Sequence, residues 1–115
     1  MMNKYFISIC FLCSFLFSGT DGTLRGKVTD SDGVPLVGTQ VYMPDLGKGT
    51  TADIDGNYII LNISVGDYEV RFLMIGYQTK IYENVTITMD QTRWLNPELG
   101  VASIEGEVVK VRAGF

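Results

Sequence analysis

The chain has 115 residues, of which 46% are hydrophobic, and its formal net charge is −4 with no histidine. This length allows one small globular domain, and the acidic balance argues against a nucleic-acid or anionic-membrane surface. The absence of histidine excludes imidazole bases, Ser-His-Asp and Cys-His nucleophile systems and histidine-ligated zinc, so any catalysis would depend on carboxylates.

The N-terminus has the features of a secretory signal peptide over residues 1–18. Lys4 precedes an apolar run, residues 5–17, that ends at the small residues Ser18 and Gly19. Such a run is short for a membrane-spanning helix and matches the apolar part of an export signal. A buried strand or an uncleaved anchor stays open as the alternative, because bulky side chains stand where cleavage prefers small ones. Both cysteines lie in this segment, so the exported part would fold without a disulfide.

The remainder of the chain is predicted to form β-strands, because apolar and polar residues alternate along it. In chain order, the residues expected to face inward are Leu24, Gly26 and Val28; Val37, Thr39, Val41 and Met43; Tyr68, Val70, Phe72 and Met74; and Ile81, Val85, Ile87 and Met89. Residues 50–52 would close one strand and residues 58–61 open the next. Asn84 is expected at a bend or bulge, and a last strand at residues 92–99 would end on a sheet edge because of Pro97. Short strands separated by Gly, Pro and Asp indicate an antiparallel sandwich.

The segment DIDGN is predicted to be a hairpin connection in which Asp53 and Asp55 cap backbone amides and Gly56 adopts a positive φ. The carboxylate oxygens of Asp53 and Asp55, at alternate positions, also suggest a calcium-binding loop. An EF-hand loop needs Gly at its sixth position and Glu at its twelfth, whereas here Gly56 is fourth and Ser64 is twelfth. The same spacing recurs in DSDG, residues 30–33, which favours a turn motif. We therefore expect no metal and no cofactor, although a site built from a few carboxylates outside the EF-hand pattern stays open.

The aromatic residues divide into two groups. Tyr58, Tyr68 and Tyr77 fall beside core positions, and they are expected to pack inward with their hydroxyls at the edge. Tyr42, Tyr82 and Trp94 are the better candidates for exposed rings. Three scattered aromatics do not make a sugar-binding platform.

Spaced glycines and turn residues carry a resemblance over residues 23–99. The matching positions are Gly26, Val28, Asp30, Gly33, Pro35, Leu36, Gly38 and Val41; Gly49, Thr50, Asp53, Asp55, Gly56 and Tyr58; Gly66, Tyr68 and Val70; and Ile75, Gly76 and Tyr77. This pattern resembles the carboxypeptidase regulatory-like family. The positions to which we give a structural role are Asp30, Gly33, Pro35, Gly38, Asp53, Asp55, Gly56, Gly66 and Gly76.

The resemblance implies a seven-stranded, transthyretin-like (prealbumin or Ig-like) sandwich without catalysis. It implies an accessory domain at the N-terminus of a TonB-dependent outer-membrane receptor, acting by protein contacts in the periplasm. Its partner would be a TonB-like energy-transducing protein or the receptor's own plug or barrel. The domain would be associated with a membrane only through a downstream barrel. The alternative is a secreted or cell-surface carbohydrate-binding or adhesive module, and a transthyretin-like hydrolase ranks last because those enzymes use histidine.

The C-terminal residues 100–115 are expected to be a linker with a segment that resembles the TonB box of such receptors. The resemblance rests on Glu107, Val108, Val109, Val111 and Ala113. Lys110 and Arg112 depart from the pattern. Because alternate residues would face each side, we predict that the segment adds as a strand to a partner's sheet. The alternative is that it begins the first strand of a following domain.

Overall fold

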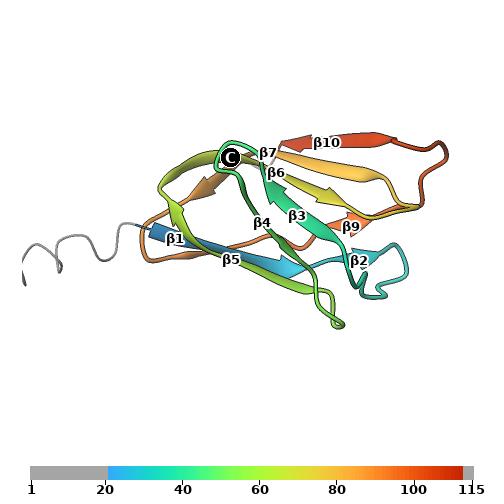
Figure 1. Ribbon diagram of the computed structural model, residues 1–115, viewed down its shortest axis with the longest axis horizontal. Coiled ribbons are helices and arrows are strands. Elements are labelled where there is room, and N and C mark those ends of the chain that lie inside the picture. Colours follow the sequence, from blue (N-terminus) through green and yellow to red (C-terminus); the bar gives the residue numbers. More distant parts are fainter. Residues whose placement is uncertain (1–20, 113–115) are drawn as a thin grey trace, which may run out of the picture.

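A computed structural model describes residues 21–112, and these residues form a β-sandwich in which none is helical (Figure 1). The strands are β1 (Asp21–Lys27), β2 (Thr29–Asp30), β3 (Gln40–Met43), β4 (Lys48–Thr51), β5 (Asn57–Ser64), β6 (Gly66–Leu73), β7 (Thr79–Ile87), β8 (Thr92–Trp94), β9 (Glu98–Leu99) and β10 (Val108–Arg112). No helix in this part of the chain is long and apolar enough to cross a membrane. The predicted signal peptide, residues 1–18, and Ala113 lie outside the described residues.

The strands form two larger sheets and one two-stranded ribbon (Figure 1). One sheet has the order β5-β1-β8, the other has the order β10-β7-β6-β3-β4, and β2 pairs with β9. The prediction of an all-β sandwich is confirmed, with ten strands in the described residues where seven were expected. The pairs β1/β5, β3/β4, β3/β6 and β6/β7 are antiparallel, whereas β1/β8, β2/β9 and β7/β10 are parallel.

The core lies between the two larger sheets. As the alternation predicted, Leu24 and Val28 of the first strand region are fully buried, and so are Val70 and Phe72 of β6. The cluster comprises Leu24, Val28, Leu36, Val41, Met43, Ala52, Tyr58, Ile60, Ile63, Val70, Phe72, Val85, Ile87 and Leu99. Removing these side chains from water is the main favourable contribution to folding.

Two of the residues expected to face inward do not. Val37 is 53% exposed and Met89 is 56% exposed. Both lie in turns beyond the strand ends, where the two-residue period no longer determines the direction of a side chain. Gly38 next to the first has a φ of 86°, and Asp90 next to the second has a φ of 55°.

Asn84 lies at a bulge in β7, as the sequence predicted, and has a φ of 59°. The register between β6 and β7 shifts at this bulge, so that Val70 pairs with Tyr82. One extra residue exchanges the two faces of a strand, and Tyr82 therefore packs against the core cluster. The expectation that Tyr82 is exposed is wrong for this reason. Ile81 pairs with Arg71 and lies outside that cluster, but it is buried as expected, with 8% of its surface exposed.

The DIDGN segment connects strands of different sheets and is not the hairpin turn that we expected. It follows β4, in the five-stranded sheet, and precedes β5, in the three-stranded sheet. Buried Ala52 leads into it, and the Asp53 N–H donates to the Asn57 carbonyl at 2.9 Å. The turn is tight as predicted, but its role is to carry the chain from one layer to the other.

Residues 92–99 form two short strands instead of the single strand expected. β8 pairs with β1 and β9 pairs with β2. Between them the Leu95 N–H donates to the Arg25 carbonyl at 3.0 Å, and the Pro97 carbonyl accepts from the Thr29 N–H at 3.1 Å. Pro97 is fully buried, and because it has no N–H it interrupts the strand hydrogen bonding between β8 and β9.

Candidate interaction strand and turn motifs

The C-terminal segment forms strand β10 at one edge of the five-stranded sheet (Figure 1, red). It runs parallel to β7, with Val108 beside Thr79 and Arg112 beside Glu83. The structure thus differs from the linker that we expected over residues 100–115, because the chain turns back after β9 and pairs with its own domain. Whether the strand also binds a partner stays a prediction.

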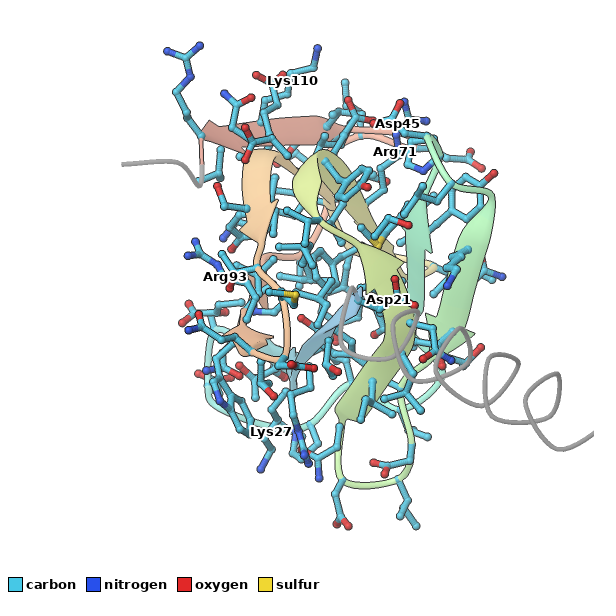
Figure 2. The ribbon with its side chains drawn as sticks, turned by 90° about the vertical axis from the view of Figure 1, so that its left-hand side faces the viewer. Asp21, Lys27, Asp45, Arg71, Arg93 and Lys110 are labelled. Carbon is cyan, nitrogen blue, oxygen red and sulfur yellow. The ribbon has the colours of Figure 1, made fainter. Side chains whose placement is uncertain are left out.

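The two faces of β10 have different character. Val109 and Val111 are half-buried, whereas Val108, Lys110 and Arg112 are exposed. The Lys110 side chain points away from the sandwich (Figure 2), and its Nζ lies 3.9 Å from Glu83 Oε1. Since both members of this ion pair are exposed, it contributes little to stability.

The backbone of β10 has one side that no other strand of residues 21–112 covers. The Thr79 N–H donates to the Glu107 carbonyl at 2.8 Å, which fixes the direction of the first backbone group. In a parallel pair, alternate residues direct their N–H and C=O groups toward the same neighbour. Val109 and Val111 therefore bond toward β7, and the backbone groups of Lys110 point to the open edge.

Few side chains attach β10 to the sandwich. None of its residues belongs to the hydrophobic core cluster. Just before the strand, the Gln78 side-chain amide donates to the Glu107 carboxylate, and the Gln78 N–H donates to the Gly100 carbonyl at 2.8 Å. Main-chain pairing with β7 is therefore the main contact that holds the strand.

The two Asp-x-Asp-Gly segments form the same local turn. The Asp53 carboxylate accepts from the N–H groups of Asp55 and Asn57, each at 2.9 Å. In the other segment the Asp30 carboxylate accepts from two N–H groups, again at 2.9 Å. The first Asp of each segment is thus the turn former, which confirms the prediction for Asp53. The expectation that Asp55 also caps a backbone amide is wrong, because Asp55 contributes its backbone N–H and leaves its carboxylate in solvent. Among residues 21–112, no three His, Cys, Asp or Glu side chains gather as metal ligands.

Replacing Asp53 by alanine is expected to lower the free energy of unfolding by about 1 kcal/mol, because two backbone N–H groups lose their acceptor. The matched change Asp55→Ala should have almost no effect. Thermal melts with and without millimolar calcium measure both. A melting temperature that rises with calcium in the parent chain and not in Asp53→Ala would contradict the turn-only role and support a metal site.

The other motif positions lie mainly in turns. Gly33, Gly38, Gly56 and Gly76 have positive φ, between 78° and 87°. Pro35 pairs with Thr29 across the first turn, and Gly66 begins β6. Gly56 is the most constrained of them, because a Cβ there would lie 2.6 Å from the Val28 carbonyl oxygen.

Tyr58, Tyr68 and Tyr77 pack against the core, as the sequence predicted. The Tyr58 hydroxyl donates to the Leu95 carbonyl at 2.5 Å. Burial, with a smaller contribution from neighbouring Tyr82, raises the pKa of Tyr58 far above its ordinary value, and burial raises the pKa of Tyr82 as well. Both hydroxyls therefore keep their protons near neutral pH, which does not suit a general base.

Exposed aromatic rings are present but do not gather. Tyr42 is 41% exposed on β3, and Trp94 is 59% exposed on β8. These strands belong to different sheets. The Trp94 ring instead makes a cation–π contact with the Arg25 guanidinium. The Arg25 Cζ lies 4.8 Å from the ring centroid.

Solved structures with the same fold come from several kinds of protein. A chain of a type II cohesin–X-dockerin complex from Acetivibrio cellulolyticus is 21% identical, with a TM-score of 0.61 over 74% of this chain and 62% of that one. The minor pilin GBS52 of Streptococcus agalactiae is 20% identical, with a TM-score of 0.52 over 74% of this chain and 46% of that one. A candidate carbohydrate-binding protein from Bacteroides uniformis is 13% identical, with a TM-score of 0.54 over 70% of this chain and 42% of that one.

Each of these alignments covers less than two thirds of the other protein's chain, and at these identities the likeness shows the fold alone. The comparison with curated proteins finds no match. The model of the carboxypeptidase regulatory-like domain matches residues 23–100, which leaves β10 outside it. The chain belongs to the carboxypeptidase regulatory-like domain family.

Proposed function

We propose that this domain is a non-catalytic, N-terminal accessory module of a TonB-dependent outer-membrane receptor, acting by protein contacts in the periplasm. The observation that carries the proposal is the open edge of β10, a valine-rich strand that lies beyond the C-terminal end of the family match. An exposed strand edge presents unpaired N–H and C=O groups that another strand can complete. The apolar run at residues 5–17 supports export of the domain.

The partner would add one extended strand to β10. Main-chain hydrogen bonds would supply affinity, and alternate side chains would supply selectivity. The exposed cations Lys110 and Arg112 favour a partner strand with carboxylates at alternate positions. A TonB-like energy-transducing protein and the receptor's own plug are the two partners that this role allows.

Three features support a non-catalytic role. The chain has no histidine, which removes the commonest general base. The tyrosines whose pKa is raised hold their protons more strongly, as expected of packed core residues rather than of acid–base catalysts. The carboxylates of Asp30 and Asp53 accept hydrogen bonds from backbone N–H groups.

Lys110→Pro tests the proposal in a receptor that carries this domain. Proline removes the N–H that points to the open edge, and an edge strand tolerates proline on its solvent side. We expect energy-dependent uptake to fall to background, while ligand binding at the cell surface stays intact. Lys110→Ala is the matched control, because it removes the charge but keeps the N–H, and it should retain most of the uptake.

Val109→Pro provides a second control, since its N–H bonds toward β7. That change should detach β10 from its own domain, which loss of hydrogen-exchange protection along β10 would reveal. Unchanged uptake in the Lys110→Pro receptor would overturn the strand-addition role and leave β10 as a structural edge.

The carbohydrate-binding alternative has one feature in its favour, the exposed ring of Trp94. Because Arg25 already covers that ring and Tyr42 lies in the other sheet, we expect no tight sugar binding. Titration calorimetry against glucans, xylans, pectins and peptidoglycan fragments should give no micromolar affinity. A micromolar affinity that Trp94→Ala abolishes would favour the adhesive module instead.

A further inference from the structure

A second feature of the molecule lies at the end of the sandwich where β6 stops and β7 and β10 begin. A partly open groove of about 790 Å³ runs there between the turn after β6 and the loop before β10. Its apolar lining comes from Leu73, Met74, Ile75, Tyr77, Ala102 and Ile104. No lysine or arginine lines it, and Glu105 is its acidic member.

The rim of this groove exposes large aliphatic side chains. Ile75 is 96% exposed and Ile104 is 70% exposed, on the two segments that face each other across the groove. Val101 is next to the lining residue Ala102 and is 69% exposed, although it does not itself line the groove. A single exposed aliphatic residue needs no explanation, but several around one concave surface are typical of a protein interaction site.

The segments that join the strands at this end carry charges of one sign. Four loops meet there, residues 30–38, 53–57, 74–78 and 98–107, and they contain no lysine or arginine. Of the thirteen acidic residues in the chain, these loops hold seven, which are Asp30, Asp32, Asp53, Asp55, Glu98, Glu105 and Glu107. The nearby cations belong to the strands themselves: Lys27 ends β1, and Lys80 of β7 donates from its Nζ to the Glu98 carbonyl at 3.0 Å. The strand pairings place these loops at one end of the sandwich, because each pair of strand ends that borders them is hydrogen-bonded. The pairs are Lys27 with Asn57, Gln40 with Leu73, Gln40 with Thr51, and Thr79 with Val108.

Both ends of the described chain lie away from the groove. β1 begins beside the end of β5, and β10 runs from the groove toward that same opposite end (Figure 1). The open backbone edge of β10 also faces sideways from the sheet and is not part of the groove lining. A ligand in the groove would therefore not compete with a strand added to β10.

We infer that this groove is a second docking site, and that its occupant is a protein segment that presents an aliphatic side chain flanked by lysines or arginines. The apolar lining would receive the aliphatic side chain, and the acidic loops would attract the flanking cations. An anionic membrane is disfavoured by the same seven carboxylates. The domain would thus hold one partner at the β10 edge and a different, basic one at its acidic end.

The test is an NMR titration of the isotopically labelled chain with a capped hexapeptide of alternating lysine and leucine. We expect amide shift changes concentrated at residues 73–79 and 101–106. A hexapeptide of alternating glutamate and leucine should bind at least about tenfold more weakly, and added salt should reduce the difference.

The double variant Ile75→Ser/Ile104→Ser should weaken binding of the lysine peptide about tenfold, because both residues are exposed and the change should leave the fold intact. Ile59→Ser, a change of the same kind at a 42% exposed residue of β5, should leave binding unchanged, and so should Lys110→Pro. Absence of binding, equal affinity for the two peptides or shifts confined to β10 would overturn the inference. Binding to phosphatidylcholine vesicles that the double variant abolishes would replace it with a membrane contact.

Discussion

Replacing Gly26 by alanine is expected to lower the free energy of unfolding by about 3 kcal/mol, which is at the upper end of the usual cost of adding a methyl group to a closely packed site. A Cβ at this position would lie 1.9 Å from the Leu95 carbonyl oxygen and 2.9 Å from the Asn96 side-chain oxygen. Both atoms are in use, because the first accepts from the Tyr58 hydroxyl and the second from the Lys27 N–H. The backbone after β8 would have to move away from β1, and these hydrogen bonds would weaken together.

Urea unfolding of the two chains measures this loss. Gly100→Ala is the matched control, because the nearest atom to its added Cβ is the end of the flexible Gln78 side chain, at 3.1 Å. The control should lose less than about 1 kcal/mol. Equal losses in the two variants would contradict the close contact between β1 and the segment that follows β8.

Phe72→Ala is expected to cost about 3–5 kcal/mol, as for other large aromatic residues removed from a core. Phe72 is completely buried, and its ring makes edge contacts with Tyr58 at 5.4 Å and Tyr82 at 5.7 Å between centroids. Its removal would leave a cavity between the two sheets and take the packing partner from both tyrosines. In a small domain with a stability of about 5–15 kcal/mol, this loss could leave the chain largely unfolded.

The next residue along β6 serves as the control for Phe72. Leu73 is 37% exposed on the outer face, and Leu73→Ala should cost less than about 1 kcal/mol. Phe72→Leu, which keeps most of the volume, should fall between the two alanine variants. If both alanine variants unfolded at the same urea concentration, the face assignment of β6 would be wrong.

The sequence predicted those parts of the fold that depend on local pattern. The two-residue alternation identified the buried faces of β1 and β6, and the Asp-x-Asp-Gly spacing identified two tight turns. Each of these patterns depends on residues that are only a few positions apart in the sequence. The spacing of short strands and turn residues predicted the sandwich, which the two larger sheets confirm. The family resemblance is confirmed by the match over residues 23–100.

Other parts depended on contacts that local pattern does not contain. The bulge at Asn84 was expected, but its effect on Tyr82 depends on how β7 registers with β6. The position of DIDGN between two sheets depends on which strands β4 and β5 join.

The interaction strand shows the same limit most clearly. Residues 108–112 pair with residues 79–83, which lie far away along the chain, so the alternation of valines and cations predicted a strand but not its neighbour. The apolar groove was missed for a similar reason. Ile75 and Ile104 belong to loops that meet only in the folded chain.

Amide hydrogen exchange along residues 107–112 tests the account most directly, because β10 as a paired strand with one open edge is its central claim. The account predicts that the amides of Val109 and Val111 exchange slowly, while that of Lys110, between them, exchanges at close to the rate of an unprotected amide. Rapid exchange at Val109 and Val111 would show that the segment is an unpaired linker, and slow exchange at Lys110 would show that the edge is already covered. Either result would contradict the open edge on which the proposed partner contact depends.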